Sequence, residues 1–224
     1  MSNSFLQFAS ITKKVVMGLA GIFLMVFLAV HLYINLLLIK GDGGVAFGEV
    51  VKFMSGNIFI SIFEYVLFGA LIIHFLIGII LKLQNWKARP VGYKVCQKSE
   101  TSFFSKYQIY TGLIVVIFLV IHFLHFFFVK LGLVSLPEVA ASRHDFYPMA
   151  IKLFTTPLYS WTYIILIAIL GFHLYHAFQS FFQTIGFQHS KYFTAIKVIG
   201  ALYSIVICAG FIVIPVYFMY FFCH

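Results

Sequence analysis

The stretch of sequence that decides the fold is residues 15–39, VVMGLAGIFLMVFLAVHLYINLLLI, which contains no charged residue. A helix needs about 20 consecutive apolar residues to cross the hydrocarbon core of a bilayer, so this stretch predicts a transmembrane helix. It is too long for the apolar segment of a signal peptide, and no A-x-A-like cleavage site follows it. We therefore expect it to be retained as the first of several membrane-spanning helices.

Four further apolar stretches of spanning length follow along the chain. The sequence predicts an all-α fold, an integral membrane bundle of five helices in which residues 1–224 form a single membrane domain. Pro157 suits the start of the fourth helix, and Pro215 predicts a kink in the fifth. The fifth helix has no interior histidine, so we expect it to pack beside the core. The expected helices are 15–39, 58–83, 107–132, 158–183 and 194–222.

The composition excludes several classes of protein. Hydrophobic residues make up 62% of the chain and charged residues only 9%, whereas soluble domains carry about 25% charged residues. The net charge of +9 is better explained by loop lysines on one side of a membrane than by nucleic-acid binding. The three cysteines form no C-x-x-C-H motif, which excludes covalent c-type haem attachment by this signature.

The distribution of lysine and arginine predicts the orientation of the helices. Ten of them fall on the side of the N-terminus and five on the opposite side, so the positive-inside rule places the N-terminus inside and the C-terminus outside. The segment from Lys82 to Lys106 is the longest inner loop. It either forms a docking surface for a soluble partner or only enforces the topology.

One histidine lies near the middle of each of the first four helices: His31, His74, His122 and His173. An ionisable side chain at that depth is costly and indicates a functional site. Histidine pairs are common axial ligands of b-type haem, and helix bundles build such sites in their core. We therefore expect two haem b groups, bound through their iron atoms by these four residues.

Depth in the membrane predicts which histidines pair. Counted from the helix ends, His31 and His122 lie nearer the outer face, while His74 and His173 lie nearer the inner face. At 1.5 Å per residue the two levels differ by roughly 9 Å. We expect His31 and His122 to bind an outer haem, and His74 and His173 an inner one.

The remaining histidines have other interpretations. His125 and His176 each follow a chosen histidine by three residues and share its face. Each either binds a haem propionate or is a satisfied polar residue near the interface. His144, His189 and His224 fall in loops or at the terminus, where a solvated side chain is expected. The four central histidines have an alternative role as core residues that hydrogen-bond between helices.

Two further features bear on the predicted site. Glu64 is the only carboxylate within a predicted span, where it either transfers quinol protons, with its pKa raised by burial, or is merely interfacial. Several glycines lie inside the helices, where they either let a flat macrocycle approach or allow close helix packing. These glycines are Gly18, Gly21, Gly69, Gly78, Gly112 and Gly171.

These features together resemble a known family, and the resemblance covers almost the whole chain. The chain is similar to the five-helix, dihaem cytochrome b membrane-anchor subunit of succinate:quinone oxidoreductases, that is, succinate dehydrogenase and fumarate reductase. Order, helix number and histidine placement carry the resemblance, and Lys87-Ala88-Arg89-Pro90 resembles the b558-type branch. The matching stretches are Val30-His31-Leu32 with Asn35, Ile73-His74-Phe75 with Gly78, Gln108 and Thr111-Gly112 before His122, and Phe172-His173 with Ser180-Phe181.

The resemblance implies a place in the respiratory chain. A flavoprotein and an iron–sulfur protein would dock on the inner face, in the cytoplasmic membrane of a bacterium. Electrons would pass between the iron–sulfur subunit and a quinone, in many relatives menaquinone, through the two haems. Lys106 falls where relatives carry a basic residue, which makes it a candidate to bind a propionate group of the inner haem.

Two other functions compete with this one. The chain is either the dihaem cytochrome b subunit of another quinone-linked oxidoreductase, such as a hydrogenase or formate dehydrogenase, or a haem-free membrane protein that conducts protons through its histidines. The placement of one histidine in each of four helices argues against the first.

Overall fold

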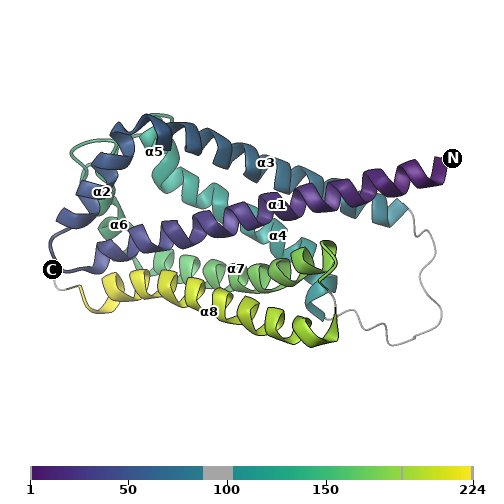
Figure 1. The fold of residues 1–224 in the computed structure, drawn as a ribbon. Helices are drawn as coiled ribbons and strands as arrows, with labels where there is room; N and C mark the ends of the chain where they lie inside the picture. The colour runs from purple at the N-terminus through teal and green to yellow at the C-terminus, as the bar shows by residue number, and fades with distance from the viewer. Residues whose placement is uncertain (1, 88–102, 188, 223–224) are drawn as a thin grey trace.

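The computed structural model describes residues 2–87, 103–187 and 189–222, and every regular element in these ranges is a helix. Five helices are long and apolar enough to cross a membrane (Figure 1). The predicted all-α membrane bundle is therefore confirmed, and the chain is a multi-pass membrane protein. The long helices are α1 (Ser2–Leu36), α3 (Ile58–Lys87), α4 (Phe103–His122), α7 (Pro157–Thr184) and α8 (Ser190–Tyr220).

Helix α7 lies at the centre of the bundle, where it packs against α1, α4 and α8. Helix α3 is held mainly by α1 and touches α4 at few points. The chain starts at one end of the bundle and α8 finishes at the other (Figure 1), and we call these the N-terminal and C-terminal ends. This arrangement leaves the region between α3 and α4 loosely packed.

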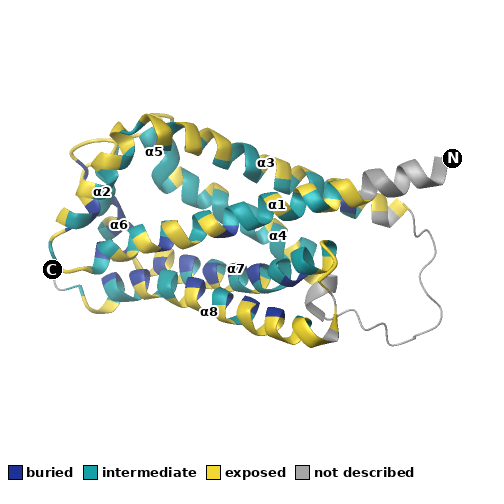
Figure 2. Ribbon diagram, in the orientation of Figure 1, coloured by how far each residue is buried: buried dark blue, intermediate teal, exposed yellow. Residues whose placement is uncertain are grey.

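The apolar core is concentrated along α7 and α8, where buried residues recur on the facing sides of the two helices (Figure 2). Helix α8 is also joined to α1, because the Tyr203 hydroxyl donates a hydrogen bond to the Met25 carbonyl at 2.6 Å. It continues through the fully buried Pro215 to Tyr220. The expectation that this helix packs beside the core is wrong, because α8 forms part of the core together with α7.

The structure also has two short helices that the sequence did not predict. Helices α2 (Val45–Gly56) and α6 (Phe146–Phe154) lie together at the C-terminal end of the bundle (Figure 1). Phe47 of α2 and Phe154 of α6 are buried in one apolar cluster with Phe218 of α8. These segments are too short to span a bilayer, so a search for long apolar stretches passes over them.

The turn before α2 depends on Asp42 and Gly44. The Asp42 carboxylate accepts hydrogen bonds from the backbone N–H groups of Gly44 and Ala46 at 3.0 and 3.1 Å. Gly44 has a φ of 85°, in the left-handed region that glycine adopts without strain. A Cβ at this position would also collide with the ring of Tyr147 in α6.

We therefore expect Gly44→Ala to destabilise the C-terminal end of the bundle by about 1–2 kcal/mol from backbone strain alone, with a further loss from the collision with Tyr147. The matched control is Gly48→Ala in α2, where an added Cβ meets nothing within 4 Å. Thermal unfolding in detergent should show a lower Tm for Gly44→Ala and no loss for Gly48→Ala. Equal Tm values for the two variants would contradict this account of the turn.

Candidate functional site

The four central histidines form two ring pairs inside the bundle. His31 of α1 faces His122 of α4, with ring centres 5.9 Å apart and ring planes at 86°. His74 of α3 faces His173 of α7, with ring centres 6.4 Å apart and ring planes at 85°. We call these the outer pair and the inner pair. They are the pairs that the depth argument expected.

The two pairs lie further apart along the bundle than the helix ends indicated. The ring of His74 rests beside Gly21 of α1, ten residues before His31. On α7, Tyr163 contacts His122 and lies ten residues before His173. Ten helical residues correspond to about 15 Å, compared with the expected 9 Å. The difference arises because the helices extend beyond the predicted spans, so their ends are poor depth markers.

Both pairs line one continuous cavity of about 1380 Å³ between the long helices. Single small-molecule pockets measure about 300–1,000 Å³, so this cavity has room for more than one ligand. Its walls are mainly apolar and aromatic, and its two ends are polar. Lys14, Lys82, Gln108 and Ser180 line the N-terminal end, and Asn35, Ser61, Glu64, Lys130 and His144 line the C-terminal end.

The inner pair is oriented by hydrogen bonds. His74 Nδ1 lies 3.1 Å from the carbonyl oxygen of Met17, and because a carbonyl only accepts, this nitrogen carries the proton. His173 Nδ1 lies 3.4 Å from the Thr111 hydroxyl, which itself donates to the Gln108 carbonyl at 2.9 Å. The hydroxyl therefore accepts from His173 Nδ1. In both rings the unprotonated Nε2 is left for a ligand in the cavity.

The outer pair is held by aromatic packing. His31 is stacked on Phe27, with ring centres 5.3 Å apart, and His122 packs against Phe126 at 5.2 Å. The Asn35 amide donates to the His31 carbonyl at 2.7 Å and lies 3.3 and 3.4 Å from the two ring nitrogens. Within the described ranges no backbone carbonyl bonds to either ring of this pair.

Two glycines make room for the inner pair. A Cβ on Gly21 would lie 3.1 Å from His74 Cε1, and a Cβ on Gly112 would lie 3.2 Å from His173 Cε1. These two glycines therefore accommodate the imidazole rings, a role that the sequence did not indicate. Gly171 fits the expected close packing of helices instead, because Cys208 of α8 lies against it.

His125 and His176, which each follow a central histidine by three residues, lie outside the cavity. His125 Nδ1 lies 2.9 Å from the Tyr163 hydroxyl, and the two rings are stacked. This favours the interpretation of His125 as a satisfied polar residue. His125 belongs to a π-helical segment, Phe123–Phe127, that joins α4 to the short helix α5 (Phe128–Lys130). His176 also does not line the cavity.

His144 is exposed, as expected for a loop residue, and it also lines the C-terminal end of the cavity, which the sequence did not indicate. The side chain of Lys106, the candidate propionate partner, lies outside the described part of the chain, as does His224.

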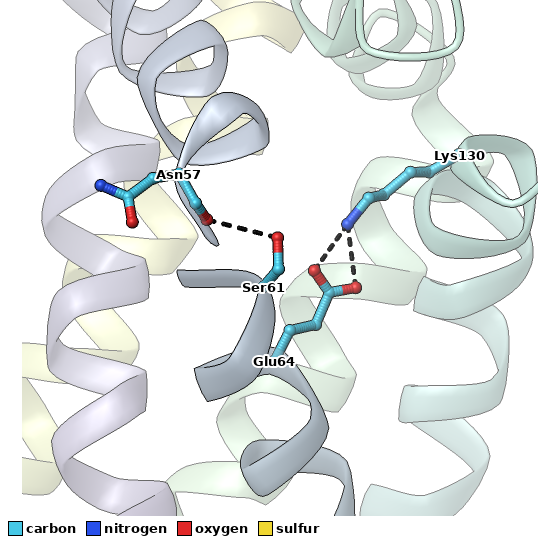
Figure 3. Close-up of polar contacts among 4 residues, drawn as sticks. All are labelled: Asn57, Ser61, Glu64 and Lys130. Carbon is cyan, nitrogen blue, oxygen red and sulfur yellow. Dashed lines mark hydrogen bonds and ion pairs between the residues drawn. The ribbon is translucent and has the colours of Figure 1, made fainter. Parts of the chain in front are cut away.

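The carboxylate of Glu64 is paired at the C-terminal end of the cavity. Both of its oxygens accept hydrogen bonds from Lys130 Nζ, at 2.8 and 2.7 Å (Figure 3). The two side chains are 34% and 28% exposed, which places the ion pair between the cavity and the surface. The Glu64–Lys130 ion pair joins α3 to α5 where α3 and α4 are loosely packed. The sequence predicted neither the partner nor the contact.

Among the described residues, no group of three or more histidine, cysteine or acidic side chains gathers into a metal site. Each ring pair offers two imidazoles to a ligand in the cavity. Comparisons of the chain with protein-family models, curated proteins and solved structures found no match.

Proposed function

We propose that this protein is a membrane cytochrome b that binds two haem groups, one between each histidine pair. The spacing of the rings carries the proposal. A metal–nitrogen bond of about 2 Å, with each ring centre about 1 Å beyond the nitrogen, puts two trans imidazoles about 6 Å apart. The observed spacings are 5.9 and 6.4 Å.

The surroundings of the pairs also fit such a group. The cavity is large enough for more than one ligand, and its apolar walls suit a flat macrocycle while its polar ends suit carboxylates. At the N-terminal end, the side-chain oxygen of Gln108 is buried without a hydrogen-bond partner. Because this oxygen only accepts, a carboxylate could bond to the amide N–H groups of Gln108 and not to this atom, while Lys14 in the cavity lining offers it a positive charge.

Haem iron, when bound, exchanges single electrons between its ferric and ferrous states. The protein contributes ligation, orientation and burial. His74 and His173 turn Nε2 toward the cavity because their Nδ1 atoms are held by backbone and hydroxyl oxygens.

We further propose that the chain anchors a succinate dehydrogenase or fumarate reductase, in the bacterial cytoplasmic membrane. In this proposal electrons pass between a docked iron–sulfur subunit and a membrane quinone of the menaquinone type. The resemblance in histidine order supports it, and Glu64, which lines one end of the cavity, is the carboxylate proposed to take the quinol protons. The flavin chemistry would belong to a partner subunit.

The purified protein should contain two haems per chain and show a reduced-minus-oxidised α-band. His31→Ala and His122→Ala should each remove the same spectral component, because they share one site. His74→Ala and His173→Ala should remove the other component. His125→Ala and His176→Ala serve as controls and should retain both haems, because these side chains lie outside the cavity. A wild-type protein without an α-band would exclude the cytochrome assignment.

Glu64→Gln keeps the size of the side chain but removes its charge and its capacity to accept a proton. If Glu64 transfers quinone protons, the rate of quinone reduction should fall by about a hundredfold or more, while the content of both haems stays unchanged. Glu49→Gln is the matched control, since Glu49 is exposed on α2. Turnover of Glu64→Gln at the wild-type rate would remove Glu64 from the proton route.

The partner assignment has its own test. When the tagged chain is isolated from its native membrane in mild detergent, a flavoprotein and an iron–sulfur protein should be recovered with it in equal amounts. Recovery of two haems without these partners would contradict the succinate assignment and leave the dihaem assignment intact.

A further inference from the structure

The hydrogen bonds that orient the inner pair follow a pattern that occurs twice. On α1, Met17 bonds to His74 and lies four residues before Gly21, which lies ten residues before His31. On α4, His173 Nδ1 lies 3.4 Å from the Thr111 hydroxyl, which in turn donates to the Gln108 carbonyl at 2.9 Å.

Gln108 in turn lies four residues before Gly112, which lies ten residues before His122. The packed helix pairs α1–α3 and α4–α7 therefore repeat one structural unit.

The spacing of four residues has a physical reason. In an α-helix a side chain leans toward the N-terminus and covers the turn before its own Cα. A side chain at position 21 or 112 would thus cover the carbonyl four residues earlier. Glycine leaves that carbonyl open to a ring from the neighbouring helix, although it costs about 1 kcal/mol relative to alanine inside a helix.

The distances show how little space there is. A Cβ on Gly21 would lie 3.1 and 3.3 Å from His74 Cε1 and Nδ1, and a Cβ on Gly112 would lie 3.2 and 3.6 Å from the same atoms of His173. By contrast, a Cβ on Gly69, in the middle of α3, meets nothing within 4 Å. Other glycines are also tight, but against other side chains, such as Gly18 against Phe181 and Gly171 against Cys208. At Gly21 and Gly112 the nearest atoms belong to the imidazole rings of the inner pair.

We propose that Gly21 and Gly112 are positioning residues of the inner haem site. Gly21 leaves the Met17 carbonyl open to hold Nδ1 of His74. Gly112 leaves room for the His173 ring, whose Nδ1 is held by the Thr111 hydroxyl. Both contacts turn Nε2 toward the cavity. This inference rests on the proposed function, and it adds that the inner site is set by hydrogen bonds while the outer site is set by aromatic packing.

Bonds of this kind fix the ring and raise the basicity of the ligand, and their loss typically weakens metal binding about 10–100-fold. Gly21→Val and Gly112→Val should therefore each lose the spectral component that His74→Ala loses, while the outer component is retained. The retained component shows that the bundle has folded. Gly69→Val is the matched control and should keep both haems.

Milder variants test orientation without displacing the ring. Thr111→Val should raise the midpoint potential of the inner haem, because a less basic ligand disfavours the ferric state, and should alter its low-spin ferric EPR signal. Thr111→Ser keeps the hydroxyl and should restore both readouts. Gly21→Ala should keep two haems and change only the inner EPR signal.

The proposal is overturned if Gly21→Val and Gly112→Val retain the inner component with an unchanged EPR signal, or if they lose the outer component instead. It is also overturned if Thr111→Val leaves the inner potential and EPR signal at their wild-type values. Failure of the proposed function would look different, since wild-type protein would then show no haem at all.

Discussion

The rest of the structure depends on the cost of placing imidazole rings inside a membrane. Six such rings lie within the described spans, and four of them face one another in two pairs across the bundle. Polar groups in a bilayer need partners. The inner rings bond to the Met17 carbonyl and the Thr111 hydroxyl, and all four paired rings line one cavity. Of the twenty buried hydrophobic residues in the described ranges, α7 and α8 hold nine. Some of them, such as Tyr163 and Ile167 of α7, also line the cavity, so core and site share this helix.

The two ring pairs are built by different means. The inner pair depends on hydrogen bonds, from His74 to the Met17 carbonyl and from His173 to the Thr111 hydroxyl, whereas the outer pair depends on neighbouring aromatic rings. A hydrogen bond at Nδ1 fixes the orientation of an imidazole ring, so the inner rings are the more firmly oriented. At the opposite end, the Glu64–Lys130 ion pair adds charge to a cavity whose walls are mainly apolar.

Much of the fold could be predicted because long apolar stretches need little context. The helices found in the structure overlap all five expected spans, and α7 begins at Pro157, as the sequence indicated. The juxtaposition of His31 with His122 could also be predicted, since depth along a helix is simply a residue count. The distance between the two histidine pairs along the bundle was underestimated. It was counted from the ends of the apolar stretches, whereas the helices continue beyond them.

The sequence by itself determined the number of spans and the residues that share a depth, because both follow from one-dimensional spacing. Only the tertiary structure decided which faces meet. The pairing of Glu64 with Lys130, 66 residues later, and of His125 with Tyr163 depends on the rotation of each helix about its axis. The contact of Gly21 with His74 depends on the register between α1 and α3. Rotation and register are set by packing across the whole bundle, which no local pattern encodes.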